Sequence, residues 1–200
     1  MLLSHIPGLL VNPETEWKAI RDEGGSVGRY FLSYIAIIAA ISPIAGFIGT
    51  TQVGWRIGAG EPVRLTVDSA LQITILYYVS ILVAVFTIGK LIHWMSETYG
   101  AQQPLSRCMA LAAYTATPLF LVGIMQLYPV LWLNFIVGLP ALAYTVFLLY
   151  TGVPIMMEIP RERGFLFSTS VLAVGLVALV GLLAATALLW GVGFSPVFTS

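Results

Sequence analysis

Charged residues are scarce in this 200-residue chain, which is 58% hydrophobic and only 9% charged. A soluble domain carries roughly 25% charged residues, which keep its surface hydrated. The mean hydropathy of +0.93 points the same way. The few charges are also clustered, because none lies between Tyr30 and Gly54, between Cys108 and Met157, or after Arg163. The sequence therefore predicts an integral membrane protein and leaves no room for a soluble catalytic domain.

Other absences narrow the chemistry. The single cysteine, Cys108, cannot form an internal disulfide, and with only His5 and His93 beside it the chain offers no ordinary zinc or haem site. A net charge of zero offers no basic patch for nucleic acid. No charged residue lies in the middle of a long apolar run, where it would mark a proton relay, and no nucleotide-binding or catalytic motif is present. We therefore expect no enzyme activity, no catalytic residue, no metal and no cofactor.

The chain does contain five apolar runs that could each cross a bilayer, which takes about 20 residues of helix. Helix is required because lipid cannot satisfy the hydrogen-bonding groups of the backbone. We expect an all-α integral membrane bundle of five transmembrane helices at Tyr30–Thr50, Ala70–Trp94, Met109–Tyr128, Leu131–Tyr150 and Leu166–Trp190. The chain then divides into a cytoplasmic N-terminal segment (1–29), a membrane domain (30–194) and a short external tail (195–200).

Basic residues predict the orientation of this bundle. With the N-terminus inside, the cytoplasmic side holds seven Lys and Arg residues, and the opposite side holds only Arg56 and Arg64. We therefore expect a cytoplasmic N-terminus and a periplasmic C-terminus. In the first external loop, two short alternating runs (55–57 and 63–67) flank a glycine-rich turn and predict a small hairpin.

The N-terminal segment has the pattern of a short amphipathic helix. Asn12 followed by Pro13 suits a helix start, and Trp17 and Ile20 share one face. Two interpretations fit this pattern equally well. The helix is either interfacial, lying on the cytoplasmic membrane surface with Trp17 as its anchor, or it caps the inner ends of the bundle.

Ionisable residues gather at the inner end of the second span. Lys90, His93, Trp94 and Glu97 form one stripe on a helix. Trp94 could stack on Lys90, and Glu97 could pair with His93 or, more weakly, share a metal with it. We favour the alternative of an interfacial belt, in which long charged side chains reach the headgroups.

Prolines interrupt three of the predicted spans. Pro43, Pro118 and Pro140 each remove a backbone hydrogen bond, so their helices should kink. Thr117 and Asn134 lie nearby and could occupy the freed groups or bridge helices. The kinks either enclose a central cavity or reflect irregular packing through small residues, and we favour irregular packing.

A family resemblance is carried by four stretches, FIGTTQVGW, LAAYTATPLFLVGIMQLYP, FLLYTGVP and ALLWGVGF, which resemble the bacterial inner-membrane branch of the Yip1-domain family. The earlier NPETEWKAIRDE is similar to the family's spaced proline, tryptophan, isoleucine and acidic residue, here Pro13, Trp17, Ile20 and Glu23. The resemblance extends from about residue 8 to residue 194. It implies a five-span bundle with a cytoplasmic N-terminus and an external C-terminus.

Eukaryotic members of the family act in vesicle traffic and associate with prenylated Rab GTPases and with one another. This chain lacks their long N-terminal region and their Asp-Leu-Tyr-Gly-Pro motif, although Tyr114 and Pro118 loosely match a later tyrosine-to-proline pattern. A bacterium has no Rab-driven vesicle pathway. A Rab-type GTPase is therefore not an expected partner.

Together these features favour a non-enzymatic multi-pass protein of the bacterial inner membrane, acting in membrane organisation through contacts. The partners would be membrane lipids, other membrane proteins or copies of itself, and Gly181 and Ala185 in the last span have the spacing typical of close helix contacts. The alternative is a small transporter or channel with a cavity lined by the kinked helices. The candidate interaction or cavity residues are Trp17, Pro43, Lys90, His93, Glu97, Tyr114, Thr117, Pro118, Asn134 and Pro140.

Overall fold

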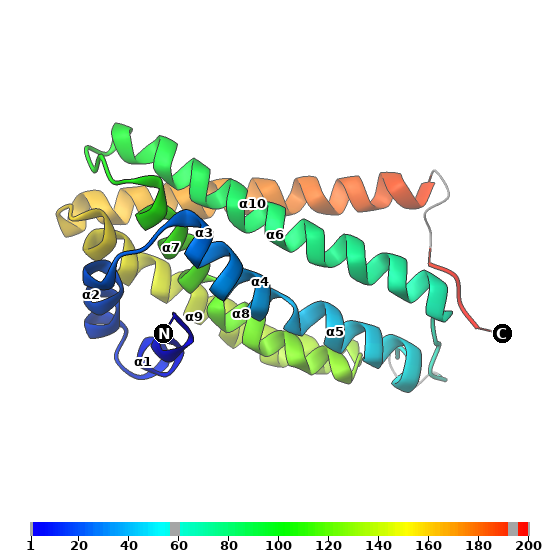
Figure 1. The fold of residues 1–200 in the computed structure, drawn as a ribbon. Helices are drawn as coiled ribbons and strands as arrows, with labels where there is room; N and C mark the ends of the chain where they lie inside the picture. Colours follow the sequence, from blue (N-terminus) through cyan, green and yellow to red (C-terminus); the bar gives the residue numbers. More distant parts are fainter. Residues whose placement is uncertain (1, 57–60, 192–195, 200) are drawn as a thin grey trace.

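Five helices that are long and apolar enough to cross a membrane make up most of the computed structural model, which describes residues 2–56, 61–191 and 196–199. The N-terminal helices lie at one end of this bundle and the C-terminal tail at the other (Figure 1). We call the first end, with residues 2–26, 99–104 and 158–160, the capped end. The far end carries residues 54–56, 61–66, 128–130 and 196–199. The five predicted spans are confirmed.

The N-terminal helices are η1 (Leu2–Ser4), α1 (His5–Val11) and α2 (Pro13–Glu23). The first span combines α3 (Val27–Tyr30), η2 (Phe31–Ile35), α4 (Ala36–Ala39), α5 (Ile41–Ile48) and η3 (Gly49–Val53). The second span is α6 (Val67–Thr98), and the third comprises α7 (Leu105–Thr115), α8 (Thr117–Val122) and η4 (Gly123–Leu127). The last two spans are α9 (Leu131–Met157) and α10 (Arg161–Gly191).

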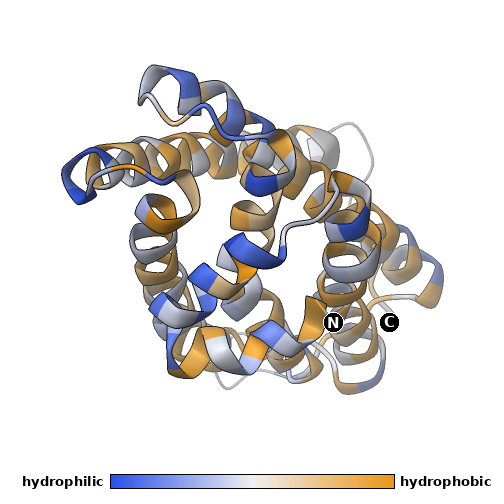
Figure 2. Ribbon diagram, turned by 60° about the vertical axis from the view of Figure 1, so that its left-hand side comes forward, coloured by the Kyte–Doolittle hydropathy of each residue, from blue (hydrophilic) through white to orange (hydrophobic). Residues whose placement is uncertain are grey.

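The long helices extend past the hydrocarbon layer. The 32 residues of α6 rise about 48 Å at 1.5 Å per residue, whereas the apolar core of a bilayer is about 30 Å thick. Hydrophilic residues gather on the N-terminal helices and at the helix ends, and the spans between them are mostly hydrophobic (Figure 2). The charged ends of the spans therefore lie in the headgroup layers or beyond them.

Two of the three predicted proline distortions are present. The first span breaks at Ala40, three residues before Pro43, and the third span breaks at Ala116, two residues before Pro118. Pro140, by contrast, does not divide α9, which continues from Leu131 to Met157. A proline removes one hydrogen bond, and the bonds of the neighbouring turns keep this helix together.

The first span also contains two π-helical segments, η2 and η3, that the sequence did not predict. These wider turns add to the break at Ala40, so the span is the least regular in the described chain. Single-turn π segments inside helices often lie at functional sites. Here η2 carries Tyr34, which points into the core of the bundle.

Small residues bring the first and third spans into direct contact. A Cβ atom on Gly123 would clash with Ser42 Oγ, and one on Gly49 would clash with the carbonyl oxygen of Gln126. The predicted packing through small residues is therefore confirmed here. Gly138 differs, because nothing lies within 4 Å of a Cβ built on it.

Backbone hydrogen bonds organise the far end. Trp55 and Val63 exchange two of them, with N–O distances of 2.7 and 2.9 Å, which matches the predicted hairpin, although its turn (57–60) lies outside the described residues. The C-terminal tail pairs with the same loop, because Thr66 N donates to the Val197 carbonyl and Thr199 N to the Arg64 carbonyl, both at 2.9 Å. The predicted domain boundary at residues 194 and 195 also lies outside the described residues.

Candidate functional site

An aromatic cluster joins the N-terminal helices to the first and third spans at the capped end. Its members are Trp17, Tyr30, Tyr34 and Tyr114, all at most 2% exposed. The ring of Tyr114 lies at its centre, 4.3 Å from the Tyr34 ring and edge-to-face with the rings of Trp17 and Tyr30 at 6.4 and 6.2 Å. Edge-to-face aromatic pairs are favourable beyond the area that they bury. The cluster therefore fixes α2 on the bundle.

Trp17 belongs to the protein core. A Cβ on Gly152 of α9 would lie 2.7 Å from Trp17 Cε2, so the indole fits only because this position is a glycine. The prediction that Trp17 anchors the helix in lipid is therefore wrong, since no part of its side chain is exposed. Of the two interpretations of this segment, the structure describes the cap, with α2 packed on α9.

Hydrogen bonds add to the aromatic contacts of the cap. The hydroxyl of Tyr114 donates to the Leu2 carbonyl at 3.0 Å, and the hydroxyl of Tyr144 on α9 donates to the Leu9 carbonyl at 2.8 Å. These two tyrosines hold the backbone of η1 and α1 against the spans. Tyr114 thus holds the N-terminal helices on the third span of the same chain.

His5 forms a clamp that sequence reasoning missed. Its Nδ1 bonds to Glu16, and its Nε2 lies 2.6 Å from Glu23 Oε2. The other oxygen of Glu23 accepts from Arg29 Nη2 at 2.6 Å. The hydrogen bond from His5 is the main reason that the pKa of Glu23 lies below its usual value, although partial burial opposes this shift. The clamp ties α1 to α2 and α2 to the start of the first span.

A second polar group ties the cap to the turn between α9 and α10. Glu158 ends α9 in a left-handed conformation, with φ of 55°. Its Oε2 accepts from Arg107 Nη1 at 3.1 Å and from Gln103 Nε2 at 3.3 Å, and its Oε1 lies 3.8 Å from Arg21 Nε. One carboxylate therefore connects α2 with the start of the third span.

The side-chain pairs considered for the ionisable stripe of α6 are absent from the described residues, and the favoured interfacial belt stays a prediction. His93 Nδ1 bonds to the Gln103 carbonyl at 3.0 Å, and no ion pair joins His93 to Glu97 in the described part of the chain. Lys90 Nζ lies 5.6 Å from the centre of the Phe86 ring, so its aromatic partner is not Trp94, which is 70% exposed. An open hollow of about 480 Å³ adjoins the stripe, lined by His93, Ser96, Glu97, Gln102, Gln103 and Pro104.

The remaining predicted residues form a buried group in the first and third spans and a second group on α9. Thr117 and Pro118 are buried near Tyr114, and Thr117 Oγ1 lies 2.6 Å from the Tyr34 hydroxyl, which bridges the third and first spans. Pro43 is also buried, in α5, which packs against α8. Asn134 instead donates to the carbonyls of Tyr128 and Val130, at 2.9 and 3.0 Å, beside its own helix start.

The second group also includes Pro140, which is exposed on α9. It therefore lies apart from the breaks at Ala40 and Ala116, and the candidate residues do not converge on one site. Within residues 2–56, 61–191 and 196–199, no group of three or more His, Cys, Asp or Glu side chains is placed to hold a metal ion.

Comparison with known proteins places this architecture in a family. The Yip1 domain model matches residues 8–182. Inner membrane protein YohC of Escherichia coli K12 is 41% identical over 192 residues, which cover 96% of this chain and 98% of that relative, and the same figures hold for the protein of that name in Escherichia coli O6:H1. No solved structure matches the chain at a significant level. The family resemblance of the sequence is thereby confirmed: this chain is a multi-pass membrane protein that belongs to the Yip1-domain family.

Proposed function

We propose that this protein is a non-enzymatic component of the bacterial inner membrane that works through contacts with lipids, with other membrane proteins or with copies of itself. The two Escherichia coli relatives are named as inner membrane proteins, which supports this location. The excess of Lys and Arg at the capped end and in the adjoining turns of the spans supports a cytoplasmic position for the N-terminus and a periplasmic position for the C-terminus.

A contrast among the glycines carries the proposal. A Cβ on Gly89, Gly123 or Gly152 would press into a neighbouring helix, so these positions are used inside the bundle. On α10, nothing lies within 4 Å of a Cβ on Gly181, and Val177, Val180 and Ala184 on the same side of the helix are exposed. The chain thus presents an apolar helix face with small residues that the described bundle leaves uncovered. Such faces allow close contact between transmembrane helices.

Cross-linking between copies in native membranes tests this proposal. A Gly181→Cys variant should cross-link to a second copy or to another membrane protein, because the position faces away from its own bundle. Cys108 is fully buried and should contribute little background. Gly181→Leu should reduce the recovery of the complex on mild solubilisation, and Gly138→Leu, at an equally open position of α9, is the matched control. A chain that forms no adduct and stays monomeric in the membrane would contradict the proposal.

The alternative of a transporter has less support. It requires space between the helices that prolines interrupt. Ser42, however, occupies the space into which a Cβ on Gly123 would extend. The carbonyl of Gln126 occupies the corresponding place beside Gly49. The breaks near Pro43 and Pro118 thus lie where the two spans are in contact. This arrangement favours packing as the role of the prolines.

A further inference from the structure

A hollow of about 500 Å³ lies between α2, the last turns of α9 and the first turns of α10. Its lining is mainly apolar and aromatic, and it carries one anionic and one cationic side chain. The lining residues are Glu14, Phe147, Tyr150, Thr151, Pro154, Ile155, Ile159, Arg161 and Phe165. The hollow thus combines three elements that lie far apart in the sequence.

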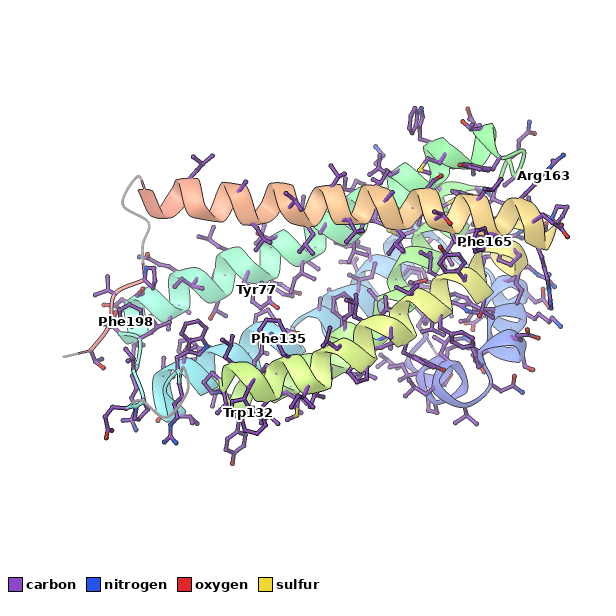
Figure 3. All side chains as sticks on the ribbon, turned by 180° about the vertical axis from the view of Figure 1, so that it is seen from behind. Tyr77, Trp132, Phe135, Arg163, Phe165 and Phe198 are labelled. Atoms are coloured by element: carbon purple, nitrogen blue, oxygen red, sulfur yellow. The ribbon has the colours of Figure 1, made fainter. Side chains whose placement is uncertain are left out.

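Contacts between α9 and α10 build the walls of this hollow. The hydroxyl of Tyr150 lies 2.9 Å from Thr169 Oγ1, and its ring lies 5.3 Å from the ring of Phe165. Nearer the turn, a Cβ on Gly164 would lie 3.0 Å from Pro154 Cβ, so the two helices are in close contact there. Figure 3 shows Phe165 and Arg163 at this end of α10, opposite Trp132 and Phe198 at the far end. The walls of the hollow are therefore held together by contacts within the chain itself.

The depth of the hollow matches the boundary between headgroups and acyl chains. Its lining residues on α9 run from Phe147 to Ile155, which spans about 12 Å along a helix. Phe147 and Phe165 are 50% and 59% exposed, so the lower part presents apolar surface to the bilayer. The upper part reaches Glu14, which lies in α2 outside the spans, and Arg161, which is the first residue of α10. An amphipathic molecule that stands upright in the membrane fits this gradient.

The two charged side chains at the rim are available to a ligand. Arg161 Nη2 lies 3.8 Å from Glu14 Oε1, which is too long for a hydrogen bond, and their side chains are 87% and 59% exposed. Nearby charges are already paired. Glu158 accepts a hydrogen bond from Arg107, and Arg21 of α2 donates one to Asp22. The rim thus offers one cation and one anion a few ångströms apart.

We propose that this hollow binds a phospholipid whose headgroup carries a primary ammonium beside its phosphate, as in phosphatidylethanolamine. The phosphate bonds to Arg161, whose guanidinium is suited to phosphate oxygens, and the ammonium donates to Glu14. One acyl chain then follows Phe147 and Phe165. Phosphatidylglycerol lacks the ammonium, and the quaternary ammonium of phosphatidylcholine has no N–H to donate. This inference rests on the lipid part of the proposed function and deepens it.

Lipid binding by the purified full-length protein tests the inference. Native mass spectrometry would compare retention of the three phospholipids with identical acyl chains, added to the protein in mild detergent. We expect phosphatidylethanolamine to bind about fivefold to tenfold more tightly than the other two, the effect of one partly exposed charge-assisted hydrogen bond. Glu14→Gln should abolish this preference, and Arg161→Gln should weaken all three lipids, while Arg161→Lys retains most of the binding.

Matched controls separate the site from the surrounding charge. Glu162→Gln and Arg163→Gln change neighbouring exposed residues that do not line the hollow, so the preference should persist in both. Because Glu14 and Arg161 are exposed, their variants should unfold at the temperature of the unaltered chain in lipid-free detergent. Equal retention of the three lipids, or a preference that survives in Glu14→Gln, would overturn the inference. The cross-linking test at Gly181 does not depend on the hollow. The contact function can therefore be supported by that test even when the lipid inference fails.

Discussion

At the scale of single residues, Trp17 determines how the N-terminal segment is used. Its indole fills the space over Gly152 and is fully buried, and its Nε1 has no hydrogen-bond partner among the described residues. Trp17→Ala should lower the free energy of unfolding of the cap by about 3–5 kcal/mol, the usual cost of removing a large core side chain. Trp17→Phe should cost much less, since it keeps an aromatic ring and removes the unpaired N–H.

Limited proteolysis at the largely exposed joint 24–26 measures this difference, because undocking of α2 releases the chain on one side of the joint and lets it bend into a protease. Lys18→Ala changes an exposed neighbour on the same helix and should leave the cleavage rate unchanged. Equal rates for Trp17→Ala and Lys18→Ala would contradict the assignment of Trp17 to the core.

The residues around Trp17 also mark what the sequence could not predict. The pattern of Trp17 and Ile20 predicts one apolar face, but the same face suits a bilayer and a protein surface equally. The His5 clamp joins Glu16 and Glu23, 11 and 18 residues away. It depends on the reversal of the chain between α1 and α2 and has no periodic signal. Only the docked tertiary arrangement brings these side chains together.

At the scale of elements, the spans and most of their irregularities follow from the sequence. Apolar length predicted five helices, and Pro43 and Pro118 predicted two interruptions, because both effects are local. The π-helical turn η2 is tied to another span, because Thr117 bonds to Tyr34, whereas the threonines of η3 bond to carbonyls of their own span. The continuity of α9 through Pro140 also lies beyond a rule based on one residue type.

The contact between the first and third spans gives the prediction at this scale. Gly123→Ala should destabilise the protein by about 1–3 kcal/mol, because the new methyl group overlaps Ser42 and the tight packing forces a shift of the helices. Ser42→Gly should partly rescue it, since it removes the atoms that the methyl group meets. Denaturation of the purified variants in detergent would measure both effects. Gly175→Ala is the control, at a position with open space, and should be neutral or slightly stabilising.

At the scale of the whole molecule, the N-terminal helices and residues 196–199 are held at opposite ends of the bundle (Figure 1). The cap binds the spans through Tyr144 and Leu9, and the tail binds the loop between the first and second spans through Thr66 and Val197. The apolar outer surfaces of α6, α9 and α10 lie between these two polar layers. Any position of the protein in the membrane must therefore place the cap in one aqueous phase and the loop with the tail in the other.

The orientation of these two layers is the prediction at this scale. The basic residues at the capped end and in the adjoining turns of the spans are Lys18, Arg21, Arg29, Lys90, Arg107, Arg161 and Arg163, and those at the far end are Arg56 and Arg64. Cytoplasmic segments hold the excess of basic residues, so the cap should face the cytoplasm. In intact cells whose outer membrane is permeable, a maleimide that cannot cross the inner membrane should label Glu61→Cys and leave Lys18→Cys unlabelled. Both positions are exposed in the fold, and buried Cys108 should give a low background. Disruption of the inner membrane should make Lys18→Cys reactive, which controls for thiol access, and labelling of Lys18→Cys before disruption would contradict the predicted orientation.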